Sequence, residues 1–357
     1  MFINYFKLNI QLFANHVNVS TDTLSSGQSY PEHNDLSAEM KTYYDMTLID
    51  EASAQLVHDQ FGQKRPIPKN GGKTIEFRKF SALPKATTAL TEGVTPDGKR
   101  LDVTSVTATV SQYGDYITQS DVLELTALDN TILEATKLLG KQAGLTLDTI
   151  VRNILIAGTN VTYCPKVATG GTETAVTSRS GLDTTAKLTV KTVQKVVAKL
   201  RGQNAPTIGG KYVAIIHPYV AYDLMRDPEW IDAHKYATPT NLYEGEIGEV
   251  AGVRFVQTTE AKVFNDSSCP ETAASSGKYH SVFATLFIAE GAYGVTEITG
   301  GGLQTIVKQK GSAGTADPLD QRSSVGWKAI KTAELLVPNY LVRVESCSPD
   351  FDTTAAN

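Results

Sequence analysis

One long amphipathic segment, residues 129–157, most constrains how this chain can fold. Its apolar residues recur at steps of three or four, the spacing that places side chains on one face of an α-helix. Asp129 is a favourable N-cap, and Gly158 lies where a glycine commonly ends a helix. At 1.5 Å per residue this helix would be roughly 42 Å long. A helix of that length needs a broad surface on which to lie.

The apolar face of this helix is expected to pack against strands that come late in the chain. Strands are predicted at 325–337 and 340–344, paired with each other beside the helix, with Trp327 and Leu335 in contact with it. The helix residues assigned to this contact are Leu139, Leu147, Ile150 and Ile154.

Other residues of the helix predict particular contacts. Gly140 and Gly144 lie one turn apart on one side, and each is unfavourable inside a helix, so we expect another backbone to approach closely there. Asp148 and Arg152 have the spacing of an ion pair along a helix.

Residues 73–118 predict a long β-hairpin with little core of its own. Two alternating segments rich in Thr and Val, at 74–80 and 103–117, flank the turn signal at 96–98. The predicted arms hold roughly 15–20 residues each and would reach ~50–60 Å. Because a two-stranded ribbon is marginally stable alone in water, it should lie on another molecule or domain. Its tip supplies the candidate inter-subunit contacts Glu92, Gly93, Asp97, Lys99 and Arg100.

Composition excludes several classes of protein. The chain has 357 residues, a net charge of −5 and a pI near 5.7, which argues against a strong nucleic-acid binder. The three cysteines are far apart, so neither a disulfide framework nor a CxxC metal site is indicated. No apolar run approaches the ~20 residues of a membrane span. The apolar opening lacks a basic n-region, which favours a docking arm over a signal peptide.

No motif for catalysis, a metal or a cofactor is found, and the expectation is that the protein is not an enzyme. The sequence at 72–74 ends like a P-loop, but Ile67 stands where the first glycine is required and a strand follows. The six histidines show no metal-binding spacing, and no GxSxG motif occurs. Asp317 and Asp320 near Arg322 are more typical of a loop or subunit ion pair than of a catalytic carboxylate pair.

Several stretches, in this order, resemble the N-four-type family of tailed-phage major capsid proteins. They are QFGQKRPIPKNGGKTIEFRKFSALPKATTALTEGVTPDGKRLDV at 60–103, Gln112-Tyr113-Gly114, Ser120-Asp121, GEIGEVAGVRF at 245–255, DPLDQ at 317–321 and VGWK at 325–328. The resemblance covers about residues 36–347. It implies the α+β Hong Kong 97-type fold, in which an arm, an extended loop, a peripheral domain and an axial domain build hexamers and pentamers.

The resemblance implies the following division of the chain. The N-terminal arm is 1–61, with a helix at 37–61, and the extended loop is 73–118. The peripheral domain comprises 119–185 and 310–357, with the spine helix at 129–157, and the axial domain is 186–309. No basis is found for the inter-subunit Lys–Asn cross-link of some relatives.

The resemblance also implies a place and partners. The shell would be a homo-oligomer found in the virion, assembled in the host cytoplasm with portal and scaffolding proteins. Packaged double-stranded DNA would be contacted weakly and without sequence specificity, since phosphate contacts come from Lys and Arg and the chain is mildly acidic.

Two other functions are compatible with parts of the sequence. An encapsulin-type bacterial compartment shares the fold and would be indicated by a groove for cargo peptides. A soluble α/β enzyme would elute as a small oligomer, whereas a shell protein forms megadalton particles or capsomers.

Overall fold

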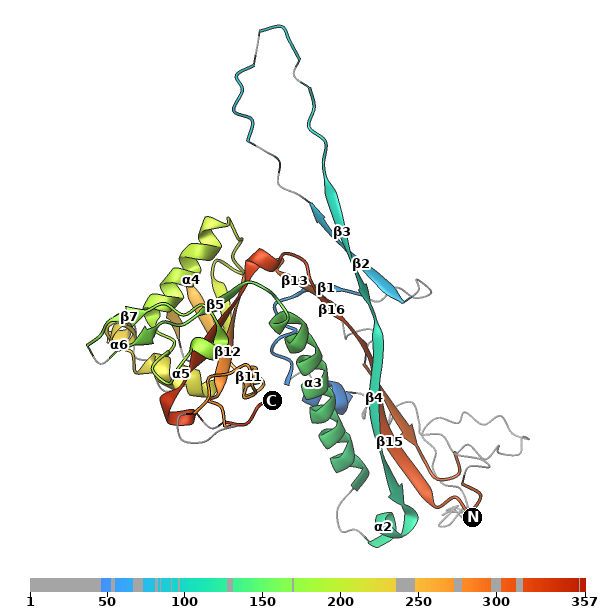
Figure 1. The fold of residues 1–357 in the computed structure, drawn as a ribbon. Coiled ribbons are helices and arrows are strands. Elements are labelled where there is room, and N and C mark those ends of the chain that lie inside the picture. The colour runs from blue at the N-terminus through green and yellow to red at the C-terminus, as the bar shows by residue number, and fades with distance from the viewer. Residues whose placement is uncertain are drawn as a thin grey trace, which may run out of the picture.

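The computed structural model describes residues 46–357 apart from several gaps, so most of the predicted arm at 1–61, including the start of its helix at 37–61, lies outside the described residues. The gaps are 53–54, 67–72, 81–82, 84, 91, 96, 127–130, 169, 236–247, 273–277, 297–302, 313–316 and 353. A large sheet with helices forms one side of the molecule, and a long helix beside a narrow sheet forms the other (Figure 1).

The long helix α3 spans Thr131–Ile156, which confirms the prediction of a helix over 129–157. Its apolar face is buried at steps of three or four residues, as the sequence pattern requires. The side chains of Leu139 and Leu147 are no more than 1% exposed. This helix is the element onto which the neighbouring segments pack.

A three-stranded antiparallel sheet lies along α3, in the order β14 (Leu303–Lys308), β15 (Arg322–Lys331) and β4 (Ser111–Ser120). The prediction that the two late strands pair with each other is wrong. After β15 and the short β16 (Ala333–Leu335), a turn at Pro338–Tyr340 leads the chain into the large sheet. The second late strand, β17 (Leu341–Cys347), pairs there with other strands.

The large sheet has seven strands and mixed direction. Its order is β5 (Val161–Tyr163), β17, β12 (Val282–Ile288), β8 (Tyr212–Ile216), β10 (Val253–Gln257) and β9 (Glu249–Val250), with β11 (Val263–Phe264) also paired to β12. Every residue of β8 and of β12 is buried, as expected for strands covered on both faces. The helices of this part are α4 (Val190–Gly202), α5 (Pro218–Met225) and α6 (Pro228–Lys235).

The strand pairing crosses the predicted domain boundaries. β5 and β17 were assigned to the peripheral domain, yet both belong to the seven-stranded sheet of the predicted axial domain, 186–309. β14 was assigned to the axial domain, yet it pairs with β15 beside α3. The predicted boundaries do not follow the strand pairing. β5 and β17 pair although they lie far apart in the sequence, and pairing of that kind leaves no local pattern.

The hairpin forms, with arms shorter than predicted. β2 (Thr74–Phe80) and β3 (Val103–Thr109) pair over seven residues each, instead of 15–20. The chain beyond β3 leaves the hairpin because β4 pairs with β15. The base of the hairpin packs on its own chain, since Ile75 and Phe77 share a buried apolar cluster with Leu336. The base of the ribbon therefore lies on another part of its own chain, which is one of the two supports that the sequence predicts.

The predicted close approach at the two glycines of α3 is confirmed. The helical residues 46–52 and 55 cross α3 at this point. A Cβ atom added to Gly140 would lie 3.0 Å from the carbonyl oxygen of Leu48, and one added to Gly144 would lie 2.5 Å from that of Ala52. No larger residue would fit between the two backbones.

The predicted helix at 37–61 ends at residue 55 in the structure. It ends there because the backbone N–H groups that follow donate hydrogen bonds to a side chain of α3. The Asp148 carboxylate accepts hydrogen bonds from the backbone N–H groups of Val57, at 2.9 Å, and His58, at 2.7 Å. These donors would otherwise continue the helix. The chain then turns and adds β1 (Gln63–Arg65) to β13 (Tyr293–Thr296) as a parallel strand.

The predicted pair between Asp148 and Arg152 is also wrong. Asp148 accepts hydrogen bonds from the N-terminal segment, residues 46–59, and its Oδ2 lies 2.6 Å from Nδ1 of His58. Arg152 turns away and donates a hydrogen bond from Nη1 to the carbonyl oxygen of Glu260 at 2.9 Å. Both side chains are buried, and each one is satisfied by a different segment.

We predict that Gly144→Ala destabilises the unassembled subunit by about 1–3 kcal/mol, the usual cost of overpacking. The new Cβ would force the two helices apart at Ala52. Chemical denaturation of the subunit measures the effect. The control is Gly202→Ala at the end of α4, where a Cβ meets nothing within 4 Å. Equal stabilities of the two variants would contradict the close crossing.

Candidate assembly surfaces

The far part of the ribbon, residues 83–102, projects away from the body of the molecule (Figure 1). Four large apolar side chains are exposed along it: Leu83, Leu90, Val94 and Leu101, at 55–77% of their full accessible area. Sequence analysis singled out the charges of this tip and missed these residues. Their signal was present, because they recur in a stretch otherwise made of small and polar residues.

The predicted tip residues all lie in this exposed loop, and Gly93 has a positive φ of 78° that suits glycine. Both signs of charge are present, from Glu92 and Asp97 and from Lys99 and Arg100. None of these four charged side chains forms an ion pair with the part of the chain that the structure describes. The tip therefore carries charged and apolar groups without a partner in the described subunit.

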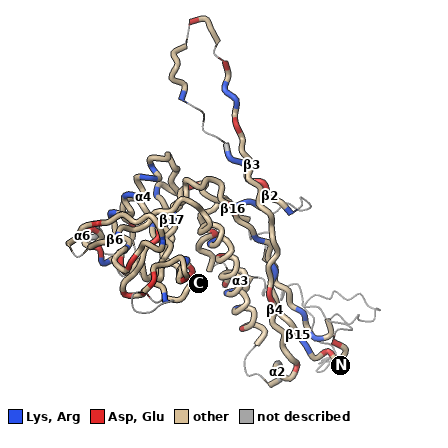
Figure 2. Tube along the Cα trace, viewed as in Figure 1, with Lys and Arg blue, Asp and Glu red and all other residues tan. Residues whose placement is uncertain are grey.

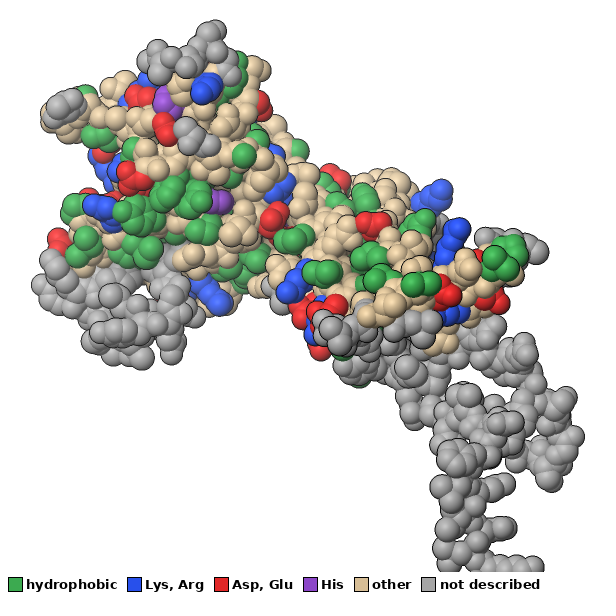
Figure 3. All heavy atoms as spheres, turned by 90° about the horizontal axis from the view of Figure 1, so that it is seen from below, with side chains coloured by type: hydrophobic (Ala, Val, Ile, Leu, Met, Phe, Trp, Pro, Cys, Tyr) green, Lys and Arg blue, Asp and Glu red, His purple; other side chains and the backbone are tan. Residues whose placement is uncertain are grey.

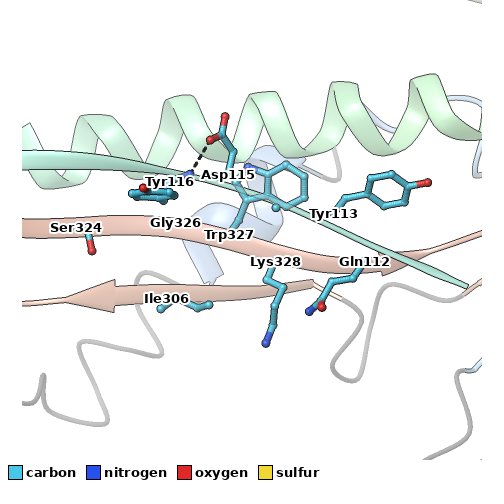
Figure 4. A pocket seen from close by; sticks show the side chains of 10 residues that line it. Gln112, Tyr113, Asp115, Tyr116, Ile306, Ser324, Gly326, Trp327 and Lys328 are labelled. Atoms are coloured by element: carbon cyan, nitrogen blue, oxygen red, sulfur yellow. Dashed lines mark hydrogen bonds between the residues drawn. The ribbon is translucent and has the colours of Figure 1, made fainter. Parts of the chain in front are cut away.

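A hollow of about 470 Å³ lies on the narrow sheet, on the face turned away from α3 (Figure 4). Ile306, Gly326 and Tyr116 are directly opposite one another on the three adjacent strands, so they share this face. The missing side chain of Gly326 leaves a depression between two apolar neighbours. Tyr116 is 68% exposed and Ile306 is 39% exposed.

Two glycines let the strands approach closely beneath the hollow. A Cβ at Gly326 would lie 2.7 Å from the Cβ of Tyr116, and one at Gly114 would lie 2.6 Å from the carbonyl oxygen of Trp327. Larger residues would push β4 and β15 apart. The glycines thus fix both the shape of the hollow and the pairing of the strands that form it.

The opposite face of the same sheet is fastened to α3. Trp327 Nε1 donates a hydrogen bond to Gln142 Oε1 at 3.3 Å, and Gln142 Nε2 donates to Asp115 Oδ2 at 2.6 Å. The hydrogen bond from Gln142 lowers the pKa of the Asp115 carboxyl. These contacts hold the strands that form the hollow at a fixed position on the helix.

The predicted contact residues of α3 separate into two apolar clusters. Leu139 and Leu147 are buried with Trp327, and Ile150 is half-buried against them. Ile154 packs with Leu335 in a second cluster, which joins the helix to the large sheet. The same helix therefore bridges both parts of the molecule.

The described residues also bear on metal binding and on the membrane. No group of three or more His, Cys, Asp or Glu among them could hold a metal ion, and none of their helices could span a membrane. Three free thiols are buried, and burial raises the pKa of Cys347 to about 12.

Seen from below, apolar side chains interrupt the polar surface at several places on both parts of the molecule (Figure 3).

Comparison with known structures finds the same fold in phage capsids. The capsid of Ralstonia phage GP4 matches with a TM-score of 0.60 at 13% identity, covering 94% of this chain and 97% of that one. The capsid of cyanophage P-SCSP1u matches with a TM-score of 0.59 at 14% identity, covering 82% and 88%. The capsid asymmetric unit of cyanophage Pam1 gives 0.55 at 13% identity, covering 93% and 98%.

Comparison of sequences is also informative. No curated protein sequence matches the chain. The family model described as phage capsid protein matches residues 123–311, which include α3, most of the seven-stranded sheet and β14. That match spans more than half of the 357 residues. The chain belongs to the phage capsid protein family and is a structural, major capsid protein of the tailed-phage type.

Proposed function

We propose that copies of this major capsid protein assemble through hexamers and pentamers into a closed icosahedral shell around double-stranded DNA. The observation that carries the proposal is the exposed ribbon tip, whose apolar and charged side chains find no partner among the described residues. A second copy would supply that partner. The protein would act structurally rather than as an enzyme, with portal and scaffolding proteins joining during assembly in the host cytoplasm.

The hollow on the narrow sheet suits an apolar segment from a second copy. Tyr116 and Ile306 flank it and stay largely exposed in the single subunit, and the tip presents Leu90 and Val94. Burying apolar area of this kind stabilises contacts by roughly 25 cal/mol per Å². The ribbon extends away from its own sheet, so we propose that the tip lies on the sheet of another copy (Figure 1).

Electron microscopy of the purified protein tests the proposed assembly. Closed particles of uniform size, or rings of five and six subunits, are expected. A homogeneous small oligomer at high protein concentration would contradict the proposal and would favour an ordinary soluble protein. Particles that retain a cargo protein instead of DNA after isolation from cells would favour an encapsulin-type compartment.

We predict that Glu92→Lys or Arg100→Glu leaves the melting temperature of the isolated subunit nearly unchanged, because both side chains are exposed there. Either change should raise the concentration needed for particle formation, since ion pairs desolvated between subunits contribute more than exposed ones. Light scattering against protein concentration, at low and high salt, measures this.

The control for the charge changes is Lys141→Glu, which alters an exposed side chain of α3 far from the ribbon. Its assembly curve should match that of the unaltered protein. Coincident curves for all variants at low salt would mean that the tip charges remain solvated in the shell.

For the hollow, we predict that Tyr116→Ala raises the critical concentration of assembly about tenfold, which corresponds to ~1.4 kcal/mol per contact. Its melting temperature should change little, because the ring is mostly exposed in the subunit. Leu138→Ala is the control, since Leu138 is 62% exposed on α3, on the other side of the sheet. Unchanged assembly of Tyr116→Ala would exclude the hollow as a contact.

A further inference from the structure

The exposed face of helix α4 carries positive charge alone. Lys191, Lys195 and Lys199 follow one another at four-residue steps, and all three are exposed. No Asp or Glu occurs anywhere in residues 184–222, which contain this helix. Figure 2 shows basic positions along α4. We call Lys191, Lys195, Lys199 and Arg201 the basic stripe.

This pattern works against the stability of the helix itself. Like charges four residues apart repel each other on a helix surface. Lys191 lies in the first turn, where the helix dipole disfavours a cation and where no acidic residue is present, whereas Lys199 and Arg201 lie in the last turn, where the dipole favours cations. The stripe therefore calls for a stabilising partner elsewhere.

The subunit neutralises the stripe only in part. Lys191 pairs with Glu173 at 2.8 Å, and Lys199 Nζ donates a hydrogen bond to Asn160 Oδ1 at 2.5 Å. Lys195 and Arg201 form no hydrogen bond or ion pair through their side chains within the described ranges. These two cations have no carboxylate in ion-pair contact within the described ranges.

The adjoining helices α5 and α6 carry the complementary surface. Tyr222, Met225 and Ile231 are 37–45% exposed, and the carboxylates of Glu229 and Asp232 are exposed among them. Arg226, which follows α5, donates a hydrogen bond to the hydroxyl of Tyr222, and α6 ends at a second cationic residue, Lys235. We use the name acidic surface for Tyr222, Met225, Glu229, Ile231 and Asp232. Apolar groups with charged neighbours are typical of a protein interface.

The two surfaces are held rigidly on one part of the chain. The backbone N–H of Val190, at the start of α4, donates a hydrogen bond to Asp227 Oδ2 at 2.8 Å, just before α6 begins. The basic stripe runs along α4 away from this junction (Figure 1). Two different, complementary surfaces on one subunit are compatible with head-to-tail contacts, and such contacts generate rings when the rotation closes.

From this charge complementarity we infer that the basic stripe of one copy docks on the acidic surface of the next copy around a ring. The inference rests on the proposed assembly into hexamers and pentamers. Duplex DNA is the other polyanion that a basic stripe could bind. The structure favours a second copy, because the same chain presents an acidic and partly apolar counterpart on the adjoining helices.

Charge reversal with compensation tests the inference. Lys195→Glu and Glu229→Lys are made separately and together in the full chain, with Lys141→Glu as the matched control. In a head-to-tail contact each changed surface meets the other changed surface. Each single change should therefore raise the protein concentration needed for ring formation about tenfold. The double variant should form rings at the original concentration. Sedimentation at low and high salt measures rings, and thermal melting verifies the fold.

Four results would overturn the inference. Rings unaffected by either single change would exclude this contact, while particles formed by the same samples would leave the proposed function standing. Rings lost with Lys195→Glu and not restored by Glu229→Lys would exclude this pairing. Normal rings that no longer retain duplex DNA would assign the stripe to DNA. If the unaltered protein forms neither rings nor particles, the proposed function fails together with the inference.

Discussion

The buried carboxylate of Asp148, midway along α3, is the group on which the arrangement of the subunit depends. It accepts two backbone hydrogen bonds from the N-terminal segment and lies 2.6 Å from the His58 ring. A buried charge is tolerated only when it is paired and fully hydrogen-bonded. The position of the N-terminal segment on α3 is therefore set by the need to supply hydrogen bonds to this buried carboxylate, in addition to apolar packing.

Neighbouring polar groups extend this anchor to β13, which pairs with β1 and β16, and to β15 of the narrow sheet. Tyr293 donates a hydrogen bond from its hydroxyl to the carbonyl oxygen of His58, and Lys331 of β15 pairs with Asp59. Burial lowers the pKa of the Lys331 amino group, and the nearby Asp59 carboxylate opposes that shift. Removing one partner of a buried pair commonly costs about 3–5 kcal/mol. The anchor thus joins residues 57–59, α3, β13 and β15 into one frame.

This frame explains why the ribbon can project without a core of its own. Its base is buried through Phe77, whose ring lies against Gly294 of β13, so that a Cβ there would meet the ring at 2.3 Å. The strand that continues from the ribbon, β4, is fixed to α3 through the contacts of Asp115 and Gln142. A rigid base lets a tip with little secondary structure be presented at a defined place, which is what a repeated contact between subunits needs.

Local patterns in the sequence were sufficient for the elements themselves. The 3.6-residue period identified α3, the two glycines identified the helix crossing, and the family resemblance implied the fold. Pairing of distant segments could not be predicted, because β17 and β12 are joined only by tertiary contacts. Local spacing also gave a wrong prediction at Asp148. Its carboxylate binds the backbone N–H of the distant His58 and not the side chain of the nearby Arg152. The hollow depends on Gly326 lying between strands that are far apart in sequence.

We propose that the ribbon tip is needed for the shell and is not needed for the fold of the subunit. The most direct measurement replaces residues 83–102 by a short Gly-Ser turn, which keeps the paired strands β2 and β3 and their buried base. The shortened subunit should melt cooperatively at nearly the original temperature, and electron microscopy should find no closed particles. Closed shells in normal yield from the shortened protein would contradict the account.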